Sequence, residues 1–276
     1  MPKREIEKRI TRFQSVLRKG GVDGAFILQN VDIFYFSGTI QSSILFIPQE
    51  GPPVLMVKKS YQRASDESQV QELIRLNHRS EIPSILERYG YGDLNLVGLE
   101  MDVVPTNQYL WYQKNFTKCK WIDISSEIRK LRMIKSPYEI EQIRRAALAL
   151  DKGFNEIKGI IREGMSELEI DGQLFLLARR NGHMGILRMR GWNQEMTHAH
   201  VLSGVNGSAI SFCDTPTGGA GVTPAMAQGA GFRRIKKNEP IAIDYGLGIN
   251  GYVGDEFRTF VIGKLQRVLE EAHECS

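Results

Sequence analysis

Cysteine is scarce in this chain of 276 residues. The three cysteines, Cys119, Cys213 and Cys275, are far apart and form no C-x-x-C pair. An odd, widely spaced set indicates neither a disulfide framework nor a cysteine-based zinc cluster. Because unpaired thiols are typical of a reducing compartment, we expect a cytoplasmic protein.

Long apolar runs are also missing. No stretch approaches the roughly 20 apolar residues that a membrane-spanning helix needs. The first 17 residues read as a charged amphipathic helix rather than a signal peptide, with Ile6, Ile10, Phe13 and Leu17 on one stripe. We therefore expect no membrane partner.

Charge of one sign is not concentrated anywhere. The 36 basic and 32 acidic residues give a net charge of +4 and are mixed along the chain. The short basic run at residues 233–237 reads as a solvated turn, so nucleic-acid binding is not expected. The glycine-rich stretches lack the pattern of a phosphate-binding loop, and there is no internal repeat. A hydrophobic content of 42% is ample for the core of one or two domains.

The first half predicts an α/β domain with a mixed sheet, over residues 1–127. An initial helix should end at Gly20-Gly21. Helical stretches are predicted around residues 69–89 and 106–115. Strand-like runs are predicted at residues 25–28, 33–36, 43–47, 54–57, 94–99 and 119–122.

A second domain is predicted over residues 128–276. SPYE, with Ser136 as N-cap and Glu139 closing a capping box, begins a long amphipathic helix. A second capping box, Ser166 with Glu169, begins another helix that Asn181-Gly182 should end. The chain then becomes glycine-rich and strand-like.

Two aspartates near the end of the chain are the most informative feature. Asn250-Gly251 is a favoured two-residue hairpin turn, and a hairpin centred there pairs residues whose numbers sum to 501. Asp244 then faces Phe257 and Asp255 faces Gly246. Both carboxylates come out on one face as diagonal neighbours, about 7 Å apart, where they can share cations.

The residues alone leave two interpretations of this pair open, aspartates without a metal and a metal site. The aspartates can be solvated residues on an exposed hairpin face, or their charge can be offset by Arg258 and Thr259 without a metal. A metal site is favoured by the buried-sheet residues around them, because carboxylates in a sheet interior need a cation or several donors.

Taken in order, these segments resemble the creatinase, aminopeptidase P and prolidase family. The junction LRMIKSPYEIEQIRRAALALDKGF and the motif IDYGLGINGYVGDEFRTF carry the specific match, and GVDGAFILQNVDIFYFSG is similar to the start of the N-terminal domain. The resemblance implies an α/β N-terminal domain followed by an α+β domain of the pita-bread fold. The second domain would be incomplete here.

The resemblance also implies a function, the metal-dependent hydrolysis of Xaa-Pro peptide bonds. Asp244 would bind one divalent ion and Asp255 would bridge two, with Arg258 and Thr259 orienting the carboxylates. Oxygen ligands suit Mn or Co, with Zn or Fe possible. A small peptide would be the substrate, and a homodimer is expected.

Two departures from the family pattern matter. Ser211 stands where the catalytic family has a histidine that assists proton transfer, so no residue is assigned as the catalytic acid or base. The further ligands, one His and two Glu residues, have no counterparts after Asp255. We therefore expect a fragment of a longer protein, inactive by itself.

Other candidates are weaker. His198 and His200, two apart, should share a strand face, and His200 is predicted to line the site. Cys213-Asp214 has no base beside it, and Arg188, Arg190 and Trp192 read as strand and loop residues. Two rival functions remain, a non-catalytic module that binds peptides or proteins and a metal-independent creatinase-like hydrolase.

Overall fold

The computed structural model describes residues 1–191, 194–211 and 217–275. Contacts divide the chain into two compact units, one formed by residues 1–135 with 190–193, the other by residues 136–189 with 194–276. The sequence places the division after residue 127, which falls inside helix α6 (Ser125–Met133). Ile128 and Leu131 of α6 are buried in the core of the first unit. No helix in the described part of the chain has the length and apolar character to cross a membrane.

The first unit contains a sheet of six described strands in the order β4-β3-β2-β1-β5-β6. Strand β2 runs antiparallel to both neighbours, whereas the other pairs are parallel. The sheet is therefore mixed, as the sequence predicts. The strand bounds are β1 (Gly24–Ile27), β2 (Ser43–Pro48), β3 (Val54–Val57), β4 (Glu72–Arg75), β5 (Leu96–Leu99) and β6 (Lys120–Asp123).

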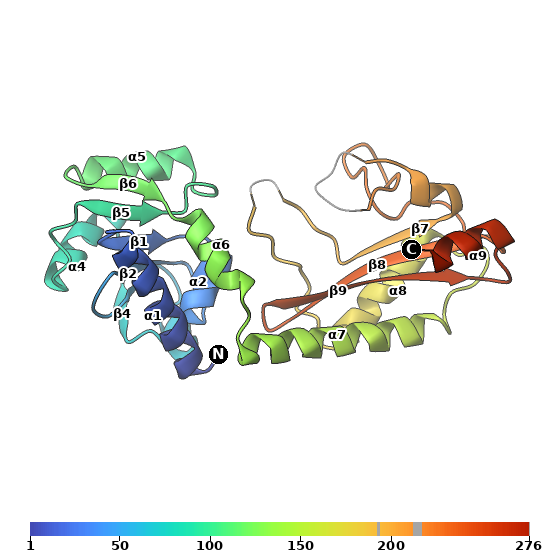
Figure 1. The fold of residues 1–276 in the computed structure, drawn as a ribbon, viewed down its shortest axis with the longest axis horizontal. Helices are drawn as coiled ribbons and strands as arrows, with labels where there is room; N and C mark the ends of the chain where they lie inside the picture. Colours follow the sequence, from blue (N-terminus) through green and yellow to red (C-terminus); the bar gives the residue numbers. More distant parts are fainter. Residues whose placement is uncertain (192–193, 212–216, 276) are drawn as a thin grey trace. The chain divides into compact units, whose positions relative to one another are not determined.

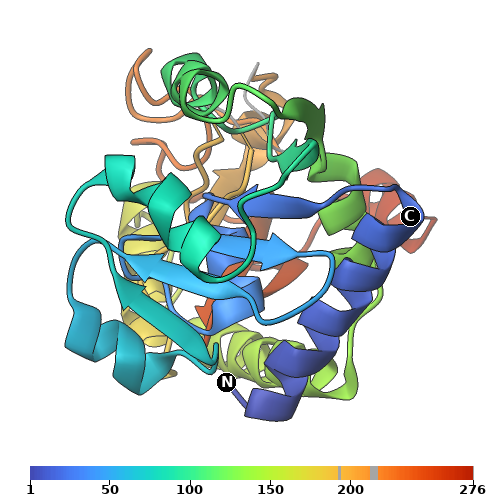
Figure 2. The ribbon, with the colours of Figure 1, turned by 90° about the vertical axis from the view of Figure 1, so that its left-hand side faces the viewer.

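Helices cover both faces of this sheet (Figure 1). Alternate strand residues, such as Ala25 and Phe26, enter two separate apolar clusters. This alternation follows from the two-residue period of a strand. Figure 2 shows the sheet from the side of this unit. The helices on one face are α1 (Lys3–Lys19), α2 (Asn30–Ser37), α3 (Tyr61–Glu67) and α6, and those on the other are α4 (Ile82–Arg88) and α5 (Thr106–Asn115).

Two sequence predictions in this unit are wrong. The apolar run at residues 33–36 is part of helix α2, because the Gln29 side chain accepts hydrogen bonds from the N–H groups of Val31 and Asp32 and Gly38 ends the helix at φ 83°. The predicted helix around residues 69–89 instead contains strand β4, the short 3-10 helix η1 (Arg79–Glu81) and α4.

The second unit begins with two helices that both carry the predicted capping boxes. Helix α7 (Pro137–Ile157) is capped by Ser136 and Glu139, and α8 (Glu167–Arg180) by Ser166 and Glu169. Both helices pack on one face of the sheet β7-β8-β9 (Figure 1). The remaining elements are β7 (Ala199–Ser203), η2 (Gly204–Ser208), β8 (Pro240–Ile249), β9 (Tyr252–Val261) and α9 (Arg267–Glu274).

The predicted hairpin register is confirmed. Ile249 pairs with Tyr252, Asp244 with Phe257, and Gly246 with Asp255. At the turn, Asn250 has φ 51° and Gly251 has φ 84°, the left-handed backbone that a type I′ turn requires. The turn chemistry thus fixes which β8 and β9 residues share a face.

The helix-facing side of β8 is apolar and fully covered. Ile241, Ile243, Tyr245 and Leu247 are 0% exposed and pack against α7 and α8. Strand β9 approaches α7 so closely that a Cβ at Gly254 would lie 3.0 Å from the Ala147 nitrogen. We call this side the helix face and the opposite side the open face.

Candidate functional site

The open face of the hairpin carries both predicted metal-binding aspartates. Because Asp244 faces Phe257 and Asp255 faces Gly246, the two carboxylates are diagonal neighbours on adjacent strands. Such neighbours have Cβ atoms about 7 Å apart or somewhat less. Asp244 is half-buried, whereas Asp255 and Phe257 on strand β9 are exposed.

Strand β7 adds His200 to this face. His200 pairs directly with Asp244 across the β7–β8 ladder, so the two side chains are cross-strand neighbours. His200 is only 7% exposed. Its Nδ1 lies 2.5 Å from the hydroxyl oxygen of Thr217, which donates to Oδ2 of Asp244 at 3.1 Å. One hydroxyl therefore bridges the imidazole and the carboxylate.

The charges on the open face influence one another. Partial burial, and then the negative charge of Asp244, raise the pKa of Asp255. Burial lowers the pKa of His200, although the charge of Asp244 acts in the opposite direction. The pair of carboxylates therefore repel each other, and a bound cation would relieve this repulsion.

Glycines let other segments approach the open face. A Cβ at Gly246 would lie 2.6 Å from Cδ1 of Leu187 and 3.8 Å from Oδ1 of Asp255. A Cβ at Gly229 would lie 2.8 Å from Cδ2 of His200. Leu187 and the Asp255 carboxylate thus both lie next to Gly246, and Gly229 packs against the imidazole of His200.

Glu167 binds residues on either side of the stretch of chain that contains Thr217 and Gly229. Its fully buried carboxylate accepts hydrogen bonds from the N–H and hydroxyl of Ser203, the side-chain amide of Asn206 and the N–H of Gly231, at 2.7–2.9 Å. Charge-assisted bonds of this kind offset the cost of burying the carboxylate. The sequence identifies Glu167 only as the residue after a helix cap.

Two family models match the chain in succession. The Creatinase/Prolidase N-terminal domain matches residues 9–134, and Metallopeptidase family M24 matches residues 141–276. The chain belongs to the creatinase/prolidase family. The double-aspartate hairpin thus lies within the part that matches the metallopeptidase model.

Relatives and solved structures agree with this assignment. An Xaa-Pro dipeptidase of Pyrococcus furiosus is 23% identical over 271 residues, which are 98% of this chain and 69% of the relative. An Xaa-Pro dipeptidase structure from Bacillus anthracis superposes with a TM-score of 0.81 at 21% identity, covering 98% of this chain and 68% of that one. For E. coli aminopeptidase P with the inhibitor Pro-Leu, the TM-score is 0.71 at 18% identity, covering 99% and 66%.

These structural likenesses establish the fold. An α/β N-terminal domain with a mixed sheet, followed by a domain of the pita-bread fold, is confirmed. The chain spans about two thirds of the length of these relatives.

The structure separates the other predicted members of the creatinase/prolidase site. Thr259 lies on the open face, opposite Ala242 and diagonal to Asp244. Arg258, one residue earlier, lies on the helix face. Its guanidinium is 2.9 Å from Glu256 and 3.8 Å from Asp151, and it stacks on Phe154. Arg258 is therefore not brought to the carboxylates that the sequence expected it to orient.

Ser211 lies in the segment that precedes Thr217. Its hydroxyl donates to the carbonyl of Ala227, and a Cβ at Gly218 would lie 3.0 Å from its backbone nitrogen. The predicted thiol candidate, Cys213 with Asp214, lies outside the described residues, as does Trp192.

His198 does not share a face with His200. It precedes β7, and its Nε2 lies 3.1 Å from Asp171 of α8 while its ring packs on Phe175. The strand alternation assumed from the spacing begins only at Ala199. Arg190 is bound inside the first unit, with Nε 2.6 Å from the buried Asp32.

The open face fits a divalent cation in part. Two carboxylates and a neighbouring imidazole are donors that transition metals accept. Across residues 1–191, 194–211 and 217–275, however, no group of three or more His, Cys, Asp or Glu side chains is placed to hold a metal ion. Asp244 and Asp255 are therefore suited to act as two ligands of a larger set.

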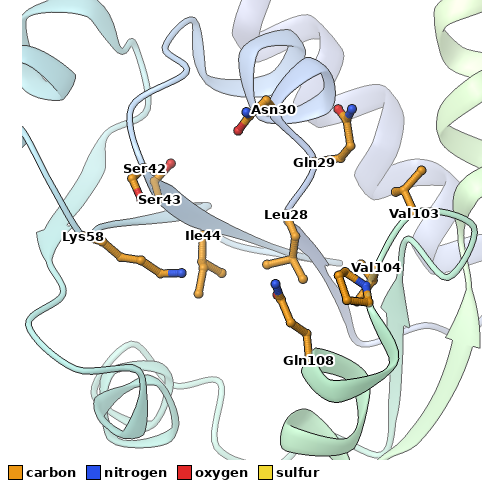
Figure 3. Close-up of a pocket in the computed structure, with 11 residues that line it drawn as sticks. Leu28, Gln29, Asn30, Ser42, Ser43, Ile44, Lys58, Val103, Val104 and Gln108 are labelled. Atoms are coloured by element: carbon orange, nitrogen blue, oxygen red, sulfur yellow. The ribbon is translucent and has the colours of Figure 1, made fainter. Parts of the chain in front are cut away.

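A pocket in the first unit is a different kind of site. A hollow of about 200 Å³ is lined by Lys58, Gln108, Leu28 and Ile44, among others. Figure 3 shows Lys58 and Gln108 extending toward it. Burial, and then the charge of Arg79, lower the pKa of Lys58. The lining contains no carboxylate, histidine or cysteine.

Proposed function

We propose that this chain belongs to a metal-dependent hydrolase that cleaves Xaa-Pro peptide bonds. The observation that carries the proposal is the shared face of Asp244 and Asp255 within the M24-matched segment. The names of the relatives, Xaa-Pro dipeptidase and aminopeptidase P, support the substrate class.

In this proposal, Asp244 and Asp255 would hold divalent ions through their carboxylate oxygens. When bound, such ions polarise a peptide carbonyl and activate water for attack on it. Thr259 lies on the same face as the carboxylates and is suited to orient them, whereas Arg258 stabilises the hairpin against α7. The shielded imidazole of His200 and the Ser211 segment would line the substrate site.

Ser211 does not supply an acid or base near neutral pH, because a serine hydroxyl does not ionise there. Proton transfer in the proposed reaction would therefore use another group. We assign no residue of the described chain to that role.

The proposal is tested by proline release from Xaa-Pro dipeptides, with the full-length protein and added Mn²⁺. Asp255→Asn should reduce turnover by at least about 100-fold, because a ligand is lost. Glu256→Gln is the matched control, since Glu256 is the next residue on β9 but lies on the helix face. Unchanged turnover in Asp255→Asn refutes the metal assignment.

A second candidate is a non-catalytic module of the same fold that binds peptides or proteins. It is favoured by Ser211 at the histidine position and by the lack, among described residues, of a third metal-binding side chain beside the aspartates. Peptide affinity that is equal with and without a chelator, combined with no hydrolysis, would support this candidate. A metal-independent creatinase-like hydrolase is disfavoured by the paired aspartates.

Several finer features belong to the same proposal. Mn or Co suits the carboxylate oxygens best, with Zn or Fe as alternatives. The scarcity of cysteine supports a cytoplasmic location. A homodimer is proposed from the resemblance to the family alone.

A further inference from the structure

Thr217 lies at the centre of two hydrogen bonds that link it to His200 and Asp244. Its hydroxyl oxygen is 2.5 Å from Nδ1 of His200 and 3.1 Å from Oδ2 of Asp244. His200 of β7 and Asp244 of β8 thus meet at the hydroxyl of Thr217, a residue from a third part of the chain.

The direction of the protons in these two hydrogen bonds follows from the chemistry of their members. A carboxylate only accepts hydrogen bonds, so the single hydroxyl proton of Thr217 points to Asp244. The hydroxyl oxygen must then accept from His200, which fixes the neutral imidazole with its proton on Nδ1. Each bond therefore determines the next.

Two backbone hydrogen bonds hold the chain directly after Thr217. Gly219 donates its N–H to the carbonyl of Ala209 at 2.9 Å, and Gly229 donates to the carbonyl of Gly218 at 2.9 Å. Gly229 in turn packs against the His200 ring, where a Cβ would lie only 2.8 Å from Cδ2. These contacts hold the backbone that follows Thr217 beside the His200 ring.

We infer that Thr217 and His200 are positioning residues that hold the Asp244 carboxylate in the orientation that binds a divalent cation. This inference rests on the proposed function. A carboxylate that is already oriented loses less side-chain entropy when it binds a metal. Hydrogen bonds behind a metal ligand contribute about 10- to 100-fold in affinity.

The inference is tested by titrating the full-length protein with Mn²⁺. Calorimetry measures the affinity, and electron paramagnetic resonance records the spectrum of the bound Mn²⁺. Thr217→Val keeps the shape but removes the hydroxyl, and should weaken Mn²⁺ binding by about 10- to 100-fold with an altered spectrum. Thr217→Ser restores the hydroxyl and should bind within about threefold of wild type. Thermal unfolding without metal monitors the fold of each variant.

A second pair of variants changes the hydrogen bond between His200 and Thr217 at the His200 side. His200→Asn places an amide N–H donor near the position of Nδ1, whereas His200→Leu removes the donor. The Asn variant should bind Mn²⁺ more tightly than the Leu variant. If Thr217→Val does not fold, this pair alone tests the positioning role. Wild-type affinity and an unchanged spectrum in both Thr217→Val and His200→Leu overturn the inference.

Asp244→Asn distinguishes a failure of the positioning role from a failure of the proposed metal site. If Asp244→Asn loses Mn²⁺ binding while Thr217→Val and His200→Leu retain it, only the positioning role fails. If the wild-type protein binds no Mn²⁺, or if Asp244→Asn binds it as well as wild type, the proposed metal site fails, and the positioning role fails with it.

Discussion

The two faces of the β7-β8-β9 sheet differ in the burial and in the chemistry of their side chains. On the helix face, Ile243 and Tyr245 are fully buried against α7 and α8. On the open face, the intervening residue Asp244 lies beside His200 and Asp255. One strand therefore alternates between residues that stabilise the fold and residues that carry candidate chemistry.

We expect the two roles to be separable at single positions. Apolar side chains on the helix face gain free energy from burial, and their removal leaves cavities. The two carboxylates of the open face gain little from packing, and partial burial, followed by the charge of Asp244, raises the pKa of Asp255. Substitutions should thus change stability on one face and ligand binding on the other.

The largest effect is expected on the helix face, from Tyr245→Ala. The ring is 0% exposed, packs edge-on against Phe154, and its hydroxyl donates to the carbonyl of Leu174 at 2.9 Å. Losing the ring should lower the free energy of unfolding by about 3–5 kcal/mol, measured by chemical denaturation. Tyr245→Phe, which loses only the hydroxyl, should cost about 1 kcal/mol. Equal losses in the two variants would contradict the packing account.

The adjacent residue on the open face should behave in the opposite way. Asp244→Asn should weaken Mn²⁺ binding by at least about 100-fold, or about 2.7 kcal/mol, because it removes a charged ligand. The free energy of unfolding without metal should change by less than about 1 kcal/mol. Calorimetric titration and denaturation of the same sample measure both quantities. A large loss of stability with unchanged Mn²⁺ binding would contradict the role assigned to the open face.

A smaller effect is expected where α7 approaches β9. Gly254→Ala adds a methyl group 3.0 Å from the Ala147 nitrogen and 3.1 Å from Cδ1 of Leu150. This crowding should cost about 1–3 kcal/mol of stability without a change in Mn²⁺ affinity. Gly251→Ala at the exposed turn is not a neutral control, because Gly251 has φ 84°. Gly207→Ala serves better, since a Cβ there meets no atom within 4 Å and the φ is not positive.

The smallest effect concerns Arg258. Its guanidinium is half exposed and pairs with Glu256 and Asp151 on the helix face. Arg258→Gln should therefore lower stability by about 0.5 kcal/mol and leave Mn²⁺ affinity unchanged. Weakened Mn²⁺ binding in this variant would show that Arg258 orients the carboxylates after all, as the sequence led us to expect.

The hairpin was predictable because a local signal determines its register. Asn250-Gly251 fixes the turn, and the two-residue alternation then places Asp244 and Asp255 on one face. The capping boxes at Ser136 and Ser166 fix two helix starts in the same local way. Each of these predictions needs only residues within about ten positions of one another.

The rest of the site depends on contacts that are distant in sequence. His200 meets Asp244 through a strand pairing that spans 44 positions, with no turn to set its register. Thr217 comes from a glycine-rich segment without strand or helix periodicity. The α2 error has a different origin. The four apolar residues 33–36 suit a buried helix as well as a strand, and the local caps at Gln29 and Gly38 decide between the two.

The most direct test is anomalous X-ray diffraction from crystals of the full-length protein soaked in Mn²⁺. The account predicts an anomalous peak on the open face, within coordination distance of the carboxylate oxygens of both Asp244 and Asp255. A fully occupied Mn²⁺ elsewhere in the molecule, with no peak beside these two residues, would contradict it.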